Sequence, residues 1–199
     1  MKALLFVLTI ILVTQHVKSQ NLVHRLIVQR SSTLQIEGTT NINRYTCEII
    51  RYTGNDTLVL HEGGRNIRPV FVKGAVELDA SSCDCGLAPM TSDFRKAINS
   101  KEFPSIVIDF ISFERMPVYA TAPDKFKGIL KISIGGVTKL FEVNCSINAT
   151  PTGIIHLVGT RAFNFADFNI TPPSRMLGAV KVNESLKVSF HLQLRLDQA

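Results

Sequence analysis

The histidines are the first candidates for chemistry, because imidazole serves both as a general acid–base group and as a common metal ligand. Four of the five histidines follow residue 20, and they lie far apart in the sequence: His24, His61, His156 and His191. No two of them have the His-x-x-x-His spacing that brings two metal ligands onto one helix face. His191 falls on the polar side of an alternating pattern, which favours a side chain that faces solvent. The histidines therefore predict no metal site.

Other motifs for catalysis are also missing from the sequence. There is no Gly-x-Ser-x-Gly elbow, phosphate loop or dinucleotide-binding glycine motif, and Gly63-Gly64 and Gly135-Gly136 are explained as turns. Five carboxylates could pair for acid–base work, although a β protein of this size has such neighbours in any case: Asp79, Asp84, Asp93, Asp109 and Glu114. We therefore expect no catalytic residue, no metal, no cofactor and no enzymatic activity.

The N-terminus has the three parts of a secretory signal, which are Lys2, the apolar run 3–13, and Val17-Lys18-Ser19. The run is about eleven residues long, too short to span a bilayer, for which about 20 are needed. Cleavage after Ser19 is predicted to leave residues 20–199 as a single domain, and no later segment is long and apolar enough for a membrane helix. We expect a soluble protein that is periplasmic or secreted.

The charge argues against a nucleic-acid partner. The formal charge is +6, and loss of Lys2 and Lys18 with the leader leaves +4. The remaining lysines and arginines are spread along the chain, whereas nucleic-acid binding favours a basic stripe with interleaved aromatic residues. The charge therefore indicates mild surface basicity.

The four cysteines are Cys47, Cys83, Cys85 and Cys145. An even number in an exported chain favours two disulfides, for which three connectivities are possible. A direct bridge between Cys83 and Cys85 would close a very small, strained ring, so each of the two is expected to bond a distant partner. The alternative is a redox-active thiol pair at Cys83 and Cys85, although no thioredoxin-like βαβ pattern surrounds it.

Alternation of apolar and polar residues predicts an all-β protein. Residues 187–196 alternate strictly, and residues 125–134 and 141–147 repeat the pattern on either side of Gly135-Gly136, which is typical of a tight hairpin. Further strands are expected at 33–38, 44–52, 69–79, 105–115 and 154–165. About eight antiparallel strands with one polar face predict a closed barrel or a sandwich rather than a parallel α/β sheet.

One short helix is expected in this otherwise β chain. Thr91 or Ser92 can cap its start, and its apolar stripe consists of Phe94, Ala97 and Ile98. A helix this short is not stable by itself in water, so it must lay its stripe on the sheet or across an open barrel end. We expect it to cover the mouth of a barrel.

Three segments resemble the bacterial YceI-like family. Residues 90–110, MTSDFRKAINSKEFPSIVIDF, are similar to the family's short helix followed by an aromatic residue, a proline and a strand. Residues 126–143, FKGILKISIGGVTKLFEV, resemble its second recurrent segment, a strand that leads through Gly-Val-Thr-Lys into a hairpin partner. Residues 184–196, ESLKVSFHLQLRL, fit its last strand in length and alternation. The matching positions are Met90, Asp93, Phe103, Pro104 and Ile106 in the first segment and Gly128, Leu130, Ile132, Gly136, Val137, Thr138 and Lys139 in the second.

The resemblance implies an eight-stranded antiparallel, lipocalin-like barrel exported to the Gram-negative periplasm. Its long apolar tunnel would hold a polyisoprenoid or another long-chain amphiphile such as a fatty acid, with no catalytic residues. The family's His-Ser pair in the first strands and its Arg with Asp-Phe-Gly near the penultimate strand are replaced here. The segments TTNINRYTCEI and CDCG look like a divergent branch of Bacteroidetes type, which implies one disulfide between Cys47 and Cys85 and a second between Cys83 and Cys145.

In such a barrel the ligand is expected to contact the inner sides of the strands, with Phe94 and Ile98 of the helix closing one end. The strand residues are Ile106, Ile108, Phe110, Phe126, Leu130, Ile132, Phe141, Val143, Phe190 and Leu192. Each of them could equally be an ordinary core residue. The alternative function is an exported structural or adhesion barrel, filled by its own side chains, whose surface loops bind protein or glycan. Large facing aromatics favour that alternative, whereas an inner glycine such as Gly128 leaves space for a tunnel.

Overall fold

The computed structural model describes residues 22–64, 67–175 and 179–197, and the expected leader at 1–19 lies outside them. In chain order, the elements are β1 (Val23–Val28), β2 (Thr33–Thr40), β3 (Arg44–Ile49), β4 (Thr57–His61), β5 (Val70–Lys73), β6 (Ala75–Asp79), the 3₁₀ helix η1 (Ala80–Ser82), α1 (Ala88–Ala97), β7 (Ser105–Phe113), β8 (Asp124–Ile134), β9 (Val137–Ala149), β10 (Ile154–Asn164), the 3₁₀ helix η2 (Phe165–Phe168), β11 (Ser174–Arg175) and β12 (Val180–Leu196). None of the helices in these residues combines the length and the apolar character that crossing a membrane requires.

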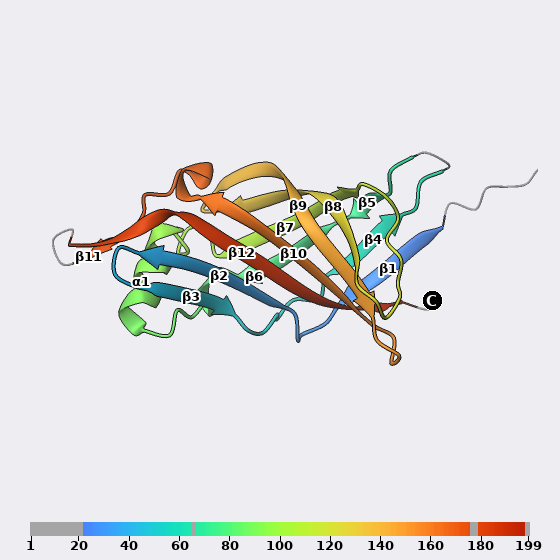
Figure 1. The fold of residues 1–199 in the computed structure, drawn as a ribbon, viewed down its shortest axis with the longest axis horizontal. Coiled ribbons are helices and arrows are strands. Elements are labelled where there is room, and N and C mark those ends of the chain that lie inside the picture. Colours follow the sequence, from blue (N-terminus) through green and yellow to red (C-terminus); the bar gives the residue numbers. More distant parts are fainter. Residues whose placement is uncertain (1–21, 65–66, 176–178, 198–199) are drawn as a thin grey trace, which may run out of the picture.

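Eight of the described strands form a closed antiparallel ring (Figure 1). The order round the ring is β1, β4, β5, β7, β8, β9, β10 and β12, and β12 closes it by pairing back onto β1. At this seam, residues 26–28 of β1 lie opposite residues 194–196 of β12. The expected eight-stranded antiparallel barrel with one short α-helix is therefore confirmed.

Extra strands extend the barrel wall at the end where α1 lies (Figure 1). The N-terminal part of β12 pairs with β2, which pairs with β3, and β6 pairs with the first half of β7. The segment from β6 to α1 runs beside β3, where Glu48 and Asp84 exchange backbone hydrogen bonds of 2.7 and 2.9 Å. A disulfide between Cys47 and Cys85 ties the segment to β3, as the resemblance implies, and so holds α1 at this end.

The long strands bury the face that the sequence pattern predicts. In β8, Phe126, Leu130 and Ile132 are buried, and the lysines between them are exposed. Gly135 and Gly136 follow with φ angles of 56° and 78°, which residues with a side chain rarely adopt. These glycines form the turn into β9, so the expected hairpin is confirmed.

Gly74 divides the single strand expected at 69–79 into β5 and β6. The backbone of β7 passes so close that a Cβ atom on Gly74 would lie 1.9 Å from the carbonyl oxygen of Phe110. The N–H of Phe110 donates to the carbonyl of Gly74 at 2.9 Å. The prediction of one strand is wrong because the close approach of two backbones leaves no signal in the sequence except the glycine itself.

The helix begins at Ala88, earlier than the expected cap at Thr91 or Ser92. A proline occupies its first turn, where a residue without an N–H is tolerated. Thr91 lies inside the helix instead, where its hydroxyl donates to Oδ1 of Asp84 at 3.1 Å and accepts from the N–H of Cys85 at 3.0 Å. The cap prediction is wrong because this side chain satisfies the preceding loop rather than the helix N-terminus.

Candidate ligand-binding site

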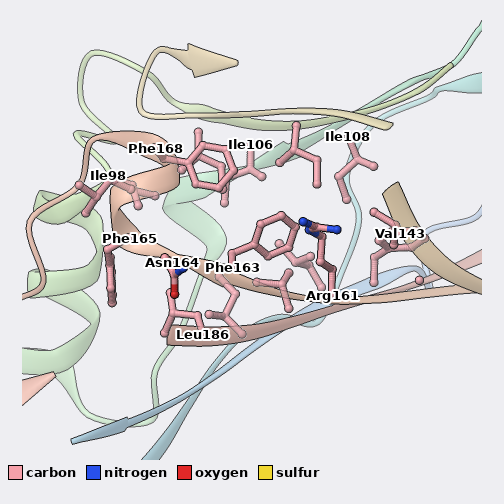
Figure 2. A pocket seen from close by; sticks show the side chains of 18 of the residues that line it. Ile98, Ile106, Ile108, Val143, Arg161, Phe163, Asn164, Phe165, Phe168 and Leu186 are labelled. Atoms are coloured by element: carbon pink, nitrogen blue, oxygen red, sulfur yellow. The ribbon is translucent and has the colours of Figure 1, made fainter. Parts of the chain in front are cut away.

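An apolar cavity lies inside the barrel next to α1 (Figure 2). Its lining residues are Leu34, Ile36, Phe94, Ile98, Ile106, Ile108, Ile132, Ile134, Val143, Gly159, Arg161, Phe163, Asn164, Phe165, Phe168, Ile170, Leu186, Val188 and Phe190. The space that the centre of a water-sized sphere can reach is about 60 Å³. An engineered cavity of about 150 Å³ is known to hold one benzene molecule. In this conformation the cavity is therefore too small for a long chain.

Seven of the twelve residues expected to contact a ligand line this cavity, and they include both helix residues. The seven are Phe94, Ile98, Ile106, Ile108, Ile132, Val143 and Phe190. The other five are buried but lie outside its lining: Phe110, Phe126, Leu130, Phe141 and Leu192. The centroid of the Phe110 ring lies 5.4, 6.1 and 5.6 Å from those of Phe71, Phe113 and Phe190. The rings of Phe71, Phe110 and Phe113 fill the barrel beyond the cavity, which occupies the α1 end, and Phe190 lies at the boundary.

Arg161 is the one charged side chain among the lining residues, and it is not among the expected ones. The alternation of β10 places it on the inner side, with Gly159 and Phe163. Its guanidinium carbon lies 4.9 Å from the ring centroid of Phe141 and 5.7 Å from that of Phe163. Its Nη1 donates to the carbonyl oxygen of Glu142, and its Nε is buried without a hydrogen-bond partner in the described residues. The phase of β10 is the sequence signal that would have found it.

The hydrogen-bonded ladder between β9 and β10 ends beside Arg161. The ladder that joins these strands ends at the pair Asn144 and Thr160. Further along, β9 remains paired with β8 and β10 remains paired with β12. We call the separation between residues 141–143 and 161–163 the β9–β10 fork. Because the ladder ends there, the carbonyl oxygen of Glu142 accepts a hydrogen bond from the Arg161 side chain instead of from the backbone of β10.

An aromatic cluster from β9, β10 and η2 packs at this fork. The ring of Phe141 lies 4.9 Å from that of Phe163 and 5.7 Å from that of Phe168, centroid to centroid. The capping box of Asn164 and Asp167 fixes the start of η2 and so positions the cluster. Sequence alternation did not predict η2, because its residues follow a 3₁₀ turn rather than a strand.

A second cavity of about 70 Å³, which is largely apolar but has Thr40, Tyr45 and Asp93 in its lining, lies beside the first. It is lined by α1 together with residues from β2, β3 and the start of β12. Phe94 of α1 and Phe165 of η2 line both cavities. These two rings therefore lie between the cavities.

The cysteines do not form the second disulfide that the resemblance implies. Cys83 and Cys145 are both free and buried. Cys83 lies beside the Cys47–Cys85 disulfide, with the three sulfur atoms within 4.8 Å of one another. Cys145 lies in β9 opposite Phe126 of β8, in a different part of the barrel, so the Cys83–Cys145 prediction is wrong. Burial raises the pKa of each of the two free thiols to about 12, which leaves neither reactive.

Two of the histidines meet across neighbouring strands. Nδ1 of His156 lies 2.8 Å from Nε2 of His191, because the pairing of β10 with β12 places both on the outer face. Burial, followed by the effect of nearby His156, lowers the pKa of His191. The fold therefore brings together two histidines that lie 35 positions apart in the sequence. Among the described residues, no further histidine, cysteine or carboxylate joins them to make a metal-binding group.

The fold is similar to that of two solved structures. BcnA from Burkholderia cenocepacia has a TM-score of 0.62 and 13% sequence identity, over 83% of this chain and 98% of that chain. A polyisoprenoid binding domain from Saccharophagus degradans, implicated in plant cell wall breakdown, has a TM-score of 0.62 and 10% identity, over 86% of this chain and 98% of that chain. The YceI protein of Campylobacter jejuni has a TM-score of 0.47 and 14% identity, over 65% and 74%.

Neither a protein-family model nor a curated protein sequence matches the chain. At these identities the likeness shows the fold alone. It confirms the barrel that the YceI-like resemblance implies, since the first two structures are covered almost completely. The Bacteroidetes-type origin stays a prediction.

Proposed function

We propose that this protein is an exported carrier that binds a long-chain amphiphile, such as a polyisoprenoid or a fatty acid, in the apolar end of its barrel and catalyses no reaction. The polyisoprenoid binding domain of Saccharophagus degradans has the same fold, which supports a lipid as the ligand. The Cys47–Cys85 disulfide supports an oxidising compartment, the periplasm or the exterior.

The observation that carries the proposal is the composition of the cavity lining. Of the lining residues, only Arg161 and Asn164 have polar side chains. A hydrocarbon chain in such a lining gains about 0.8 kcal/mol for each CH₂ group that it removes from water. Several isoprene or methylene units could therefore bind tightly without specific hydrogen bonds.

The cavity must enlarge to accept such a chain. Rotation of Phe94 and Phe165 would join the two cavities into one space beneath α1. Phe94 is only half-buried, so its ring has room to move. When no ligand is bound, Phe94 and Phe165 keep the two cavities small and so limit the contact of the apolar lining with water.

Native mass spectrometry of protein purified gently from an exporting bacterial host tests the proposal, followed by solvent extraction of whatever is bound. We expect a stoichiometric apolar adduct with the mass of a polyprenyl or fatty chain. Protein that stays bare after incubation with isoprenoid quinones and with fatty acids would contradict a carrier role.

A second candidate function is a structural or adhesion barrel that acts through its surface loops. The observation that favours it is the small cavity volume, together with the phenylalanine rings that fill the barrel beyond the cavity. In that case the protein would stay bare in the same experiment, and an immobilised sample would retain a protein or glycan partner.

A further inference from the structure

Arg161 brings a positive charge into the cavity, and the described residues supply no counter-charge. None of the ion pairs among them includes Arg161. The carboxylate of Glu142, whose carbonyl oxygen accepts from Arg161, is bound instead by Nζ of Lys127 at 2.7 Å. Arg161 is partly buried, and the part of its charge that is removed from water is costly unless an opposite charge offsets it. The cost would be removed by an anion that comes from outside the chain.

The guanidinium also has hydrogen-bond donors to spare. Nη1 of Arg161 donates to the carbonyl oxygen of Glu142, whereas the buried Nε has no hydrogen-bond partner in the described residues. Arginine presents its donors in a planar fork that matches the paired oxygens of a carboxylate or phosphate. The rings of Phe141 and Phe163 hold the guanidinium carbon at 4.9 and 5.7 Å and limit its movement. Nε has almost no accessible surface in this conformation, so an oxyanion would reach this oriented donor only when the cavity enlarges to accept a ligand.

The position of Arg161 suits the head group of an amphiphile. Figure 2 shows it between Phe163 and Val143, among the apolar side chains of the lining. It also lies at the β9–β10 fork, where the ladder between the strands has ended and aromatic side chains rather than backbone hydrogen bonds fill the wall. If the head group of a ligand bound there, its apolar chain would extend toward α1 and contact the isoleucine and phenylalanine side chains of the lining.

We propose that Arg161 is a head-group site at the β9–β10 fork and that the ligand is an acidic amphiphile, with a carboxylate or a phosphate at one end of an apolar chain. The site rests on the carrier function proposed above and narrows its ligand class. Neutral isoprenoids and long-chain alcohols are then weaker ligands than acids with a chain of the same length.

The test compares three probes that each have sixteen carbon atoms in an unbranched chain: palmitate, hexadecyl phosphate and hexadecanol. We expect the unmodified protein to bind one or both anions at least about tenfold more tightly than the alcohol. Hydrogen bonds to charged groups are stronger than hydrogen bonds to neutral groups. The preferred anion identifies the head group as carboxylate or phosphate. Equal dissociation constants for all three probes would overturn the head-group site without touching the carrier function.

Variants of Arg161 test whether the preference for anionic probes depends on this side chain. Arg161→Gln should abolish the preference for anions while hexadecanol still binds, and Arg161→Lys should retain part of it because the charge remains without the planar fork. The matched control is Arg195→Gln, an exposed arginine of β12, which should keep the full preference. An anion preference that survives Arg161→Gln would place the head group elsewhere and overturn the proposal. If none of the three probes bound the unmodified protein, the head-group site would be overturned, whereas the carrier function would still be decided by the native mass spectrometry with isoprenoid quinones.

Discussion

At the scale of single residues, the contact between His156 and His191 makes stability depend on pH. The pKa of His191 lies below its usual 6.5, chiefly because of burial and then because of His156. As pH falls below 6.5, the unfolded chain therefore takes up a proton at this position before the folded protein does. The free energy of unfolding is then lower at low pH than at neutral pH.

Urea unfolding at pH 7.5 and at pH 5.5 measures this effect. We expect His191→Gln to reduce the loss of unfolding free energy between the two pH values. His61→Gln, in β4, serves as the control and should leave the loss unchanged, because His61 is not part of the pair. An identical loss in the His191 variant and the unmodified protein would contradict the assignment.

The cysteines give a count that can be checked directly. Cys83 and Cys145 are buried thiols with pKa values of about 12, so we expect a thiol reagent at neutral pH to find no reactive thiol in the folded protein. After unfolding without a reductant it should find two, and after reduction it should find four. No thiol in the unfolded, unreduced protein would mean that Cys83 and Cys145 are bonded after all.

At the scale of elements, the partition between the two cavities should set the length of chain that the barrel accepts. Phe165→Leu removes part of the ring that separates them and should favour an 18-carbon over a 12-carbon fatty acid more strongly than the unmodified protein does. Its stability cost should stay below the roughly 3–5 kcal/mol typical of Phe→Ala, because leucine still fills part of the space.

Phe110→Leu is the matched control for this chain-length test. Phe110 is fully buried and lies outside the cavity lining, packed against Phe71, Phe113 and the lining residue Phe190. Its replacement should lower the free energy of unfolding without changing the ratio of the two dissociation constants. A ratio that responds equally to both substitutions would show that Phe165 does not separate the cavities.

The elements that the sequence predicts are those whose signal is local. The strands β8, β9 and β12 are long, so their alternation runs over many residues, and Gly135-Gly136 marks a turn. The ring strands β1 and β4 are not among the expected strands, because their sequences VHRLIV and TLVLH have adjacent apolar residues instead of strict alternation. The division at Gly74 depends on the approach of β7, which is distant in sequence.

The candidate site was predictable only in part, for a related reason. Alternation shows which residues point inward, but it does not show where the barrel is wide. Ile106 and Phe110 have the same phase in β7, yet only Ile106 lines the cavity. Arg161 shares the inward phase of Gly159, so its charge at an inner position was visible in the sequence. The separation of Arg161 from β9 was not visible in the sequence, because it depends on where the ladder between β9 and β10 ends.

At the scale of the whole molecule, stability depends on the seam between the first and last strands. Leu194 of β12 is fully buried and lies opposite both Val28 of β1 and Ile155 of β10. Because the ring closes through this contact, its loss should weaken the entire barrel rather than one edge. We expect Leu194→Ala to cost about 2–5 kcal/mol. For a chain of this length that corresponds to a fall in Tm of roughly 5–15 °C.

The neighbouring Leu196 provides the comparison, because it pairs with β1 in the same ladder but is 37% exposed. Leu196→Ala removes the same atoms from a position that is already partly in water, so its Tm should fall by only a few degrees. Both transitions can be followed by far-ultraviolet circular dichroism, and each should remain a single cooperative step because opening the seam leaves β1 and β12 with unpaired edges. Equal, small shifts in the two variants would mean that β1 does not close the barrel against β12. A large shift confined to Leu194→Ala would establish the seam as the contact on which the ring depends.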